Sequence, residues 1–321
     1  MVRTSIVVSS IIGLCLGCVG QAPDTGGGAD SGVESPDAAP GSTDAAADAR
    51  PPQTECYTEP VFPAADITDV IAAYGGSDWK DDLIAAMERR HPATAWLLDQ
   101  QRNDSYFNQF SDPNSWTGMV GWLDTLSHEQ THLFNAYHAQ AQGKPHAIFA
   151  RADLIFYLPT DPGFNRSEIW DHLAQGARDG IYAPTYLQGS SGARGFNAML
   201  DEHAAYLNEL AAVGSVGEYF QGGVSLRDGS CAFLYFIELY LRVARTDHPD
   251  VYQTLQTTPV YVEAVKTAWL RTHYFLAIAD AFPALGISDD MYRALMHQAD
   301  NRAEIEMFIG HQLDDSSCLA N

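Results

Sequence analysis

Positively charged residues are scarce in this sequence. The chain has 321 residues, with 18 Lys and Arg against 41 Asp and Glu, which gives a formal net charge of −23. Binding to nucleic acid depends on cations that neutralise phosphates, so this composition excludes a nucleic-acid-binding surface as the main function. A hydrophobic content of 46% with 11% aromatic residues excludes a wholly disordered chain and predicts a substantial folded core.

Long apolar runs are missing near the N-terminus. The run at residues 6–16 has 11 residues, far short of the roughly 20 that a membrane-spanning helix needs. It follows Arg3 and ends in small residues, which is typical of a secretory signal peptide.

The end of this run, Leu14-Cys15-Leu16-Gly17-Cys18, resembles a bacterial lipoprotein signal. The resemblance implies residues 1–18 as signal and a lipid on Cys18, the only expected membrane contact. The chain would then sit outside the cytoplasm on the cell envelope, at the outer membrane or cell surface. Simple secretion after a nearby cleavage is the alternative.

Aromatic residues are absent from residues 19–55. Of these 37 residues, 25 are Ala, Gly, Ser, Thr or Pro, and seven acids stand against one base. Such a segment cannot form a core, which predicts a disordered acidic tether. The tether carries a charge of −6, which leaves −18 on residues 56–321, the predicted folded body.

Cysteine is rare, and three of the five cysteines lie beyond the signal. Cys231 falls in an apolar stretch, where we expect a buried free thiol. Cys56 and Cys318 stand at the two ends of the folded body and are the candidates for a disulfide. Neither a paired-cysteine zinc motif nor a G-x-S-x-G element is present.

The folded body has apolar residues mostly at three- and four-residue spacing, which predicts helices. The predicted helices cover residues 78–90, 115–142, 166–175, 194–213, 230–245, 260–282 and 289–309. Strand patterns are confined to residues 147–158 and, more weakly, 180–187. The sequence therefore predicts one mostly α domain, α+β with a small sheet.

One motif carries chemistry. Ser127-His128-Glu129-Gln130-Thr131-His132 contains H-E-x-x-H inside a predicted helix. Four residues make about one turn, so both imidazoles leave the same face and can bind one Zn²⁺. The flanking residues are apolar, so the motif helix is expected to be buried, where polar side chains need partners.

At this motif the sequence resembles the zincin metallopeptidases. The resemblance covers the motif helix and a second helix, not the whole chain. It implies a zincin-like helical catalytic domain with Zn²⁺ on His128 and His132, and Glu129 as general base. A catalytic zinc also needs a third protein ligand and an open position.

Two residues compete for the third ligand. His138 lies at metzincin spacing, H-E-x-x-H-x-x-G-x-x-H, but Asn135 stands where that family has Gly, and an unbroken helix would turn His138 away. Glu202 lies in a downstream apolar helix and is followed three places on by Ala205, which resembles the gluzincin pattern. Glu202 is the favoured ligand, with Asp201 and His203 as further alternatives.

The resemblance implies peptide hydrolysis by a zinc-activated water, with Glu129 taking its proton and passing it to the leaving amine. Tyr206, His203 and His273 are candidates for stabilising the transition state. Zincins usually hold the substrate on an edge strand that precedes the motif, whereas here the best strand pattern follows it. Either that strand takes the role or the fold is a divergent, helix-rich variant.

The expected partner is a peptide or protein substrate, and the charge of the body favours cationic ones. Two other functions stay open. One is a non-catalytic surface lipoprotein with a structural or relic zinc site. The other is a zinc amidase acting on a non-peptide substrate, such as cell-wall material.

Overall fold

A computed structural model describes residues 57–221, 223, 225–287 and 289–313. Contacts between Cα atoms divide the chain into residues 1–53 and 54–321, and the first unit lies wholly outside the described part. The predictions of a lipid on Cys18, an acidic tether and a disulfide between Cys56 and Cys318 therefore concern residues outside the described ranges. Cys231 is a buried free thiol, as predicted.

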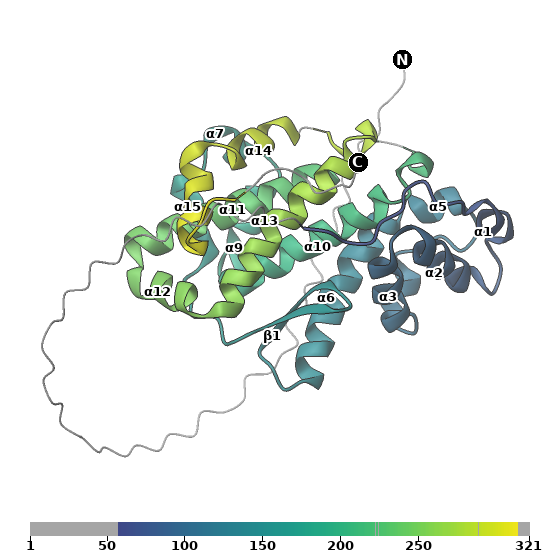
Figure 1. Cartoon of the computed structure of the whole chain (residues 1–321), viewed down its shortest axis with the longest axis horizontal. Helices are drawn as coiled ribbons and strands as arrows, with labels where there is room; N and C mark the ends of the chain where they lie inside the picture. The colour runs from purple at the N-terminus through teal and green to yellow at the C-terminus, as the bar shows by residue number, and fades with distance from the viewer. Residues whose placement is uncertain (1–56, 222, 224, 288, 314–321) are drawn as a thin grey trace, which may run out of the picture. The chain divides into compact units, whose positions relative to one another are not determined.

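Helices make up most of the second unit, which confirms a mostly α fold with a small sheet (Figure 1). The α-helices are α1 (Thr68–Ala73), α2 (Trp79–Arg90), α3 (Pro92–Gln101), α4 (Ser105–Gln109), α5 (Trp116–Val120), α6 (Leu123–Ala141), α7 (Gln175–Asp179), α8 (Tyr182–Tyr186), α9 (Gly189–Gly192), α10 (Phe196–Gly214), α11 (Leu226–Asp247), α12 (Pro249–Thr257), α13 (Pro259–Ala279), α14 (Asp289–Met296) and α15 (Ala299–Ile309). Three 3₁₀ helices complete them: η1 (Arg166–His172), η2 (Gly217–Tyr219) and η3 (Pro283–Leu285). No helix in these ranges is long and apolar enough to span a membrane.

The core is built around α10 and α11, which are buried along most of their length. Helix α10 packs against α6 on one side and against α11 and α13 on others (Figure 1). A helix that is apolar on nearly every face belongs in the interior. Any polar side chain on α10 must therefore find a partner within the protein.

The small sheet is a hairpin of β1 (His146–Arg151) and β2 (Leu154–Leu158). The strands are antiparallel, with Phe149 opposite Ile155 and a register shift between Phe149 and Arg151. Strand β1 lies against α6 and α10. The hairpin thus contacts both helices that carry the predicted site residues.

Five predicted elements differ from the structure. The predicted helix at 166–175 is a 3₁₀ helix that ends at His172, with Ala174 extended, and the predicted strand at 147–158 is the two-stranded hairpin. Residues 115–142 form two helices, α5 and α6, separated at Gly121 and Trp122, and residues 289–309 also form two. The predicted strand at 180–187 is wrong, because this segment contains helix α8. Pro184 explains the difference: it has no N–H for a sheet ladder but is tolerated in the first turn of a helix.

Candidate metal centre

The two motif histidines face each other from one side of α6. Their Nε2 atoms are 3.2 Å apart, and their rings meet edge to face with centroids 4.9 Å apart. Helix α6 runs without interruption through the motif and ends before Gly143, whose φ of +60° suits the glycine that follows a helix. The structure thus shows the one-turn spacing that the sequence predicts.

Glu202 reaches the same point from α10. Its Oε2 lies 3.5 Å from Nε2 of His132 and 3.9 Å from Nε2 of His128. One ligand atom from each of these three residues can be chosen so that all lie within 4.8 Å of one another, the spacing of a metal-binding group. The structure therefore brings together His128, His132 and Glu202.

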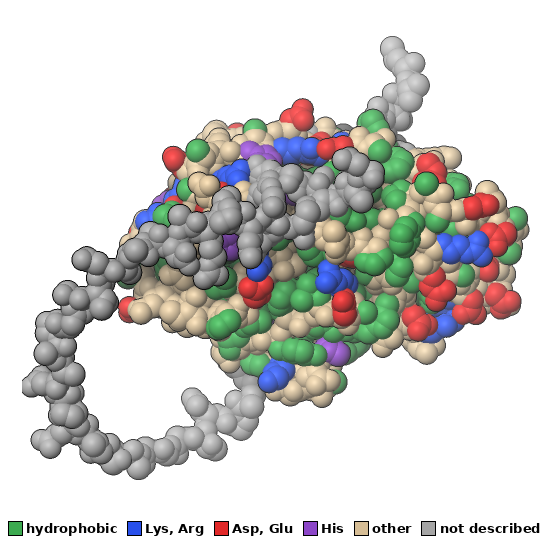
Figure 2. Space-filling model, in the orientation of Figure 1, with side chains coloured by type: hydrophobic (Ala, Val, Ile, Leu, Met, Phe, Trp, Pro, Cys, Tyr) green, Lys and Arg blue, Asp and Glu red, His purple; other side chains and the backbone are tan. Residues whose placement is uncertain are grey.

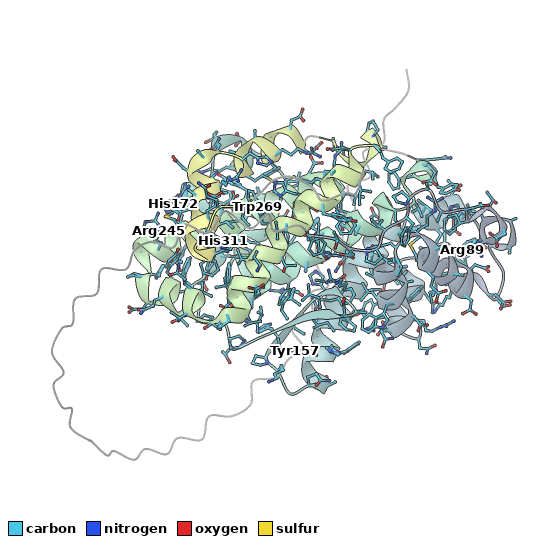
Figure 3. All side chains as sticks on the ribbon, in the orientation of Figure 1. Arg89, Tyr157, His172, Arg245, Trp269 and His311 are labelled. Carbon is cyan, nitrogen blue, oxygen red and sulfur yellow. The ribbon has the colours of Figure 1, made fainter. Side chains whose placement is uncertain are left out.

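His138, the alternative third ligand, has other partners. Helix α6 continues through Asn135 to Ala141, so the turn that the metzincin pattern requires is absent. The ring of His138 stacks on Phe134, and its Nε2 lies 2.6 Å from the hydroxyl of Tyr157 in the hairpin, labelled in Figure 3. It does not belong to the cluster.

A carboxylate binds the far nitrogen of each motif histidine. Nδ1 of His128 lies 2.9 Å from Glu209 Oε2, and Nδ1 of His132 lies 2.6 Å from Asp201 Oδ2. Both acids lie on α10: Asp201 directly precedes Glu202, and Glu209 follows it by seven residues. A carboxylate at Nδ1 fixes the ring and leaves Nε2 as the ligand atom, as is common around protein-bound metals.

These donors fit a divalent cation that accepts nitrogen and oxygen ligands. Two Nε2 lone pairs and a carboxylate oxygen converge on one point, where each would repel the others unless a proton or a cation lies between them. Two histidines and a glutamate are a known ligand set of catalytic zinc, which keeps a fourth position open. The side chains of His128 and His132 are 12% and 14% exposed, so the point is deep but reachable.

Burial and neighbouring charges act in opposite directions on the cluster. Burial alone would raise the pKa of Glu202, but the positive charge and hydrogen bond of His132, with Arg166 and His128, hold that pKa at about 2. Burial raises the pKa of Glu209 well above its usual range, and the nearby Asp124 and Glu129 add to this effect. The Glu202 carboxyl is thus ionised although it is buried, whereas burial and the neighbouring acids favour a proton on Glu209.

The second oxygen of Glu202 faces a cation of the protein. Oε1 lies 3.9 Å from a guanidinium nitrogen of Arg166, which is fully buried in η1. The same guanidinium hydrogen-bonds Ser191 through its Nε and a terminal nitrogen. Arg166 therefore directs one oxygen of Glu202 away from the histidines and leaves the other beside them.

Two tyrosines border the cluster. The ring of Tyr206, one turn after Glu202 on α10, meets the ring of His128 edge to face at 4.8 Å. Its hydroxyl lies 2.7 Å from that of Tyr186 in α8. Burial raises the pKa of both hydroxyls, so both keep their protons at neutral pH.

The other predicted site residues are distributed as follows. Glu129 follows His128 on α6 and is half-buried, and its charge acts on both His128 and Glu209. His203 is buried on another side of α10, where it bonds Thr272. His273 lies on α13, with Nδ1 bonded to the Trp269 carbonyl. Of the three candidates for transition-state stabilisation, Tyr206 is the one that touches the cluster.

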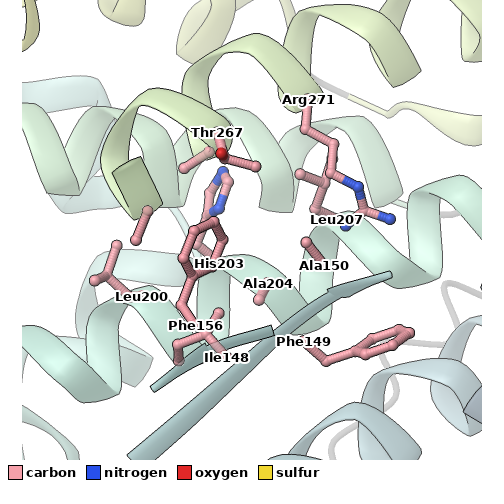
Figure 4. A pocket seen from close by; sticks show the side chains of 12 residues that line it. Ile148, Phe149, Ala150, Phe156, Leu200, His203, Ala204, Leu207, Thr267 and Arg271 are labelled. Atoms are coloured by element: carbon pink, nitrogen blue, oxygen red, sulfur yellow. The ribbon is translucent and has the colours of Figure 1, made fainter. Parts of the chain in front are cut away.

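An apolar cavity lies between the hairpin, α10 and α13 (Figure 4). His203 and Arg271 are among its lining residues, whereas the three clustered ligands are not. A second, open hollow is lined by Tyr57, Arg151 and Lys266. Both are separate from the metal-binding group, so neither defines where a substrate would lie.

Glu209, Arg166 and Tyr186 were not predicted from the sequence as site residues, and neither was the contact between Asp201 and His132. Glu209 carried one usable signal, because an acid in an apolar helix needs a partner.

Comparison of the chain with protein-family models, with curated proteins and with solved structures finds no match.

Proposed function

We propose that this protein is a zinc-dependent metallopeptidase of gluzincin type, attached to the cell surface by a lipid on Cys18. The observation that carries the proposal is the convergence of His128, His132 and Glu202, with Nδ1 of each histidine already bound by a carboxylate. The same three residues are the ones that the H-E-x-x-H motif and the acid on a second apolar helix indicate in the sequence.

His128, His132 and Glu202 would hold the metal. Zinc bound there would polarise a substrate carbonyl and lower the pKa of a water in its open position. Structural zinc sites are closed by four protein ligands. In the described ranges this group has three, which favours a catalytic site over a structural one.

The remaining residues would handle protons and orientation. Glu129, beside the first histidine, would take a proton from water and give it to the leaving amine. Tyr206, whose hydroxyl is hydrogen-bonded to that of Tyr186, would donate a hydrogen bond to the substrate oxygen that gains negative charge in the transition state. Asp201 and Glu209 would keep both imidazoles aimed at the same point.

The test is to measure zinc and hydrolysis in the same preparation. We expect about one zinc per chain by elemental analysis, and cleavage of an unspecific peptide mixture that a chelator abolishes. Glu129→Gln should keep the zinc and lose at least about 10²-fold in kcat, because it removes the general base. Full activity of that variant would overturn the mechanism, and a chain without zinc would overturn the proposal. Cleavage of cell-wall amides but not peptides would identify the zinc amidase instead.

A further inference from the structure

Asn135 occupies the position of the metzincin glycine, yet it makes no turn. It is helical and 4% exposed, and it lies on α6 three residues after His132. Its Oδ1 accepts a hydrogen bond from the backbone N–H of Phe149 in β1, at 2.8 Å. Its Nδ2 donates to Asp201 Oδ1 on α10, at 2.6 Å. The side chain of Asn135 thus connects α6, α10 and the hairpin.

These two partners fix the orientation of the amide. A backbone N–H can only donate and an ionised carboxylate can only accept, so only one orientation of Asn135 satisfies both. The carboxylate of Asp201 is then bound at both oxygens from one turn of α6. His132 Nδ1 lies 2.6 Å from Oδ2, and Asn135 Nδ2 lies 2.6 Å from Oδ1.

We infer that Asn135 is a positioning residue for the metal centre, which holds Asp201 in the orientation that aims His132 Nε2 at the Glu202 carboxylate. The hydrogen bonds run from the Phe149 N–H through Asn135 and Asp201 to the His132 ring. This inference rests on the proposed zinc site, because it states how one of its ligands is held. Asn135 would thus have a role different from that of the metzincin glycine, which ends the motif helix.

Other residue types fail at this position for definite reasons. Leu would leave the Phe149 N–H and one oxygen of Asp201 without a partner. Asp would still accept from Phe149, but it would place a second carboxylate against Asp201. The repulsion would turn the Asp201 carboxylate and release the His132 ring.

The exchange of amide and carboxylate provides the sharpest test. In the double variant Asn135→Asp with Asp201→Asn, the new acid accepts from Phe149 and from the new amide, whose oxygen accepts from His132. Zinc affinity of the full chain would be measured by competition with a chromophoric chelator. We expect each single variant to lose roughly 10- to 100-fold in affinity. The double variant should recover most of the loss.

Asn301→Asp is the matched control. Asn301 is 3% exposed on α15, where it also uses both ends of its amide, to Arg242 and the Leu295 carbonyl. This change should leave zinc affinity unaltered. Wild-type affinity in Asn135→Asp, or a double variant as weak as the product of the two single losses, would overturn the inference.

A metal-free measurement separates this inference from the proposed function. If the wild-type chain takes no zinc, the function fails, but the hydrogen bond from His132 Nδ1 to Asp201 can still be followed by proton NMR. We expect a downfield Nδ1–H resonance in the wild type and the double variant, and its shift or loss in Asn135→Asp. An unchanged resonance in Asn135→Asp would overturn the inference even without metal.

Discussion

Buried glutamates in this protein differ sharply in what surrounds their carboxylates. Glu202 lies among two histidines and an arginine, and Glu209 has His128. Glu238 on α11 is fully buried, and neither of its oxygens has a hydrogen-bond partner among the described residues. Burial raises its pKa well above the usual range, and the charge of Arg242 only partly opposes this.

Replacing Glu238 by Gln should stabilise the protein, increasingly as the pH rises. The raised pKa in the folded state means that the native protein holds a proton that the unfolded chain releases above its ordinary pKa of 4.5. Stability of the wild type should therefore fall as the pH rises from that value towards the folded pKa. Urea unfolding at several pH values would measure the gain, which we expect to reach about 1–3 kcal/mol at neutral pH and above.

The control for this prediction is Glu263→Gln on α13, an acid that is 55% exposed beside Lys266. It removes the same charge from the surface and should show little pH dependence. Equal pH profiles for the two variants would refute an unpaired buried acid at position 238.

The candidate metal site could be predicted from the sequence only in part. His128 and His132 lie one turn apart, so their juxtaposition is a local property of a helix. Glu202 could be favoured because an acid on an apolar helical face has to point inward. Its contacts with Arg166 and the binding of Nδ1 by Glu209 and Asp201 depend on how separate elements pack. Spacing along the chain does not encode that packing.

At the scale of elements, the segment 57–62 is held to the core although it forms no helix or strand. Glu59 is buried and binds Arg271 on α13 at 2.8 and 3.1 Å and His91 at 2.7 Å. Arg271 in turn donates to Asn208 on α10, at 2.8 Å. The start of the described chain is thus connected through buried polar groups to α10, the helix that carries Glu202.

Replacing Glu59 by Gln should destabilise the fold by about 3–5 kcal/mol, because Arg271 would stay buried without its counter-charge. Burial alone would raise the pKa of Glu59, but Arg271 and His91 outweigh it and hold that pKa well below its usual 4.5. The stabilisation by Glu59 is therefore complete above the ordinary pKa of 4.5, and it is lost as the pH falls from there through the lowered pKa of the folded state. Denaturant unfolding of both proteins should show a difference that shrinks in acid.

Asp69→Asn offers a matched control, since Asp69 pairs with Arg89 at 2.6 Å on the surface. Exposed ion pairs of this kind contribute little to the free energy of unfolding. The free energy of unfolding should hardly change in this variant. A similar loss in both variants would show that burial does not distinguish the two ion pairs.

Element types were predictable where a pattern was long. Helices α10, α11 and α13 follow from sustained apolar spacing. The break between α5 and α6 and the helical turn at 182–186 were not predictable, because short segments are decided by packing around them. Periodicity over five residues cannot separate a strand from a helix.

At the scale of the whole molecule, charge is the property that a substrate would meet first. Residues 56–321 carry −18, and Figure 2 shows acidic side chains over the α1–α3 end, partly paired as Asp69 with Arg89 and Asp81 with Arg102. If the protein is a peptidase, kcat/KM for a cationic peptide should fall as salt rises, because the Debye length is about 10 Å at 0.1 M. Steady-state assays with basic and acidic versions of one peptide would measure this. Identical, salt-independent rates would refute electrostatic attraction.

The backbone N–H and C=O of Phe149 have a consequence for self-association. A two-stranded sheet exposes backbone groups along its outer edges, and such edges can pair with strands of other molecules. On the edge of β1 that faces away from β2, the N–H of Phe149 is bound by Asn135 and its C=O by Asn208. Each of these two backbone groups already has a side-chain partner, which an incoming strand would have to displace in order to pair with Phe149. The contacts that join the hairpin to α6 and α10 therefore also disfavour, at Phe149, aggregation through this edge and the binding of a substrate as an added strand.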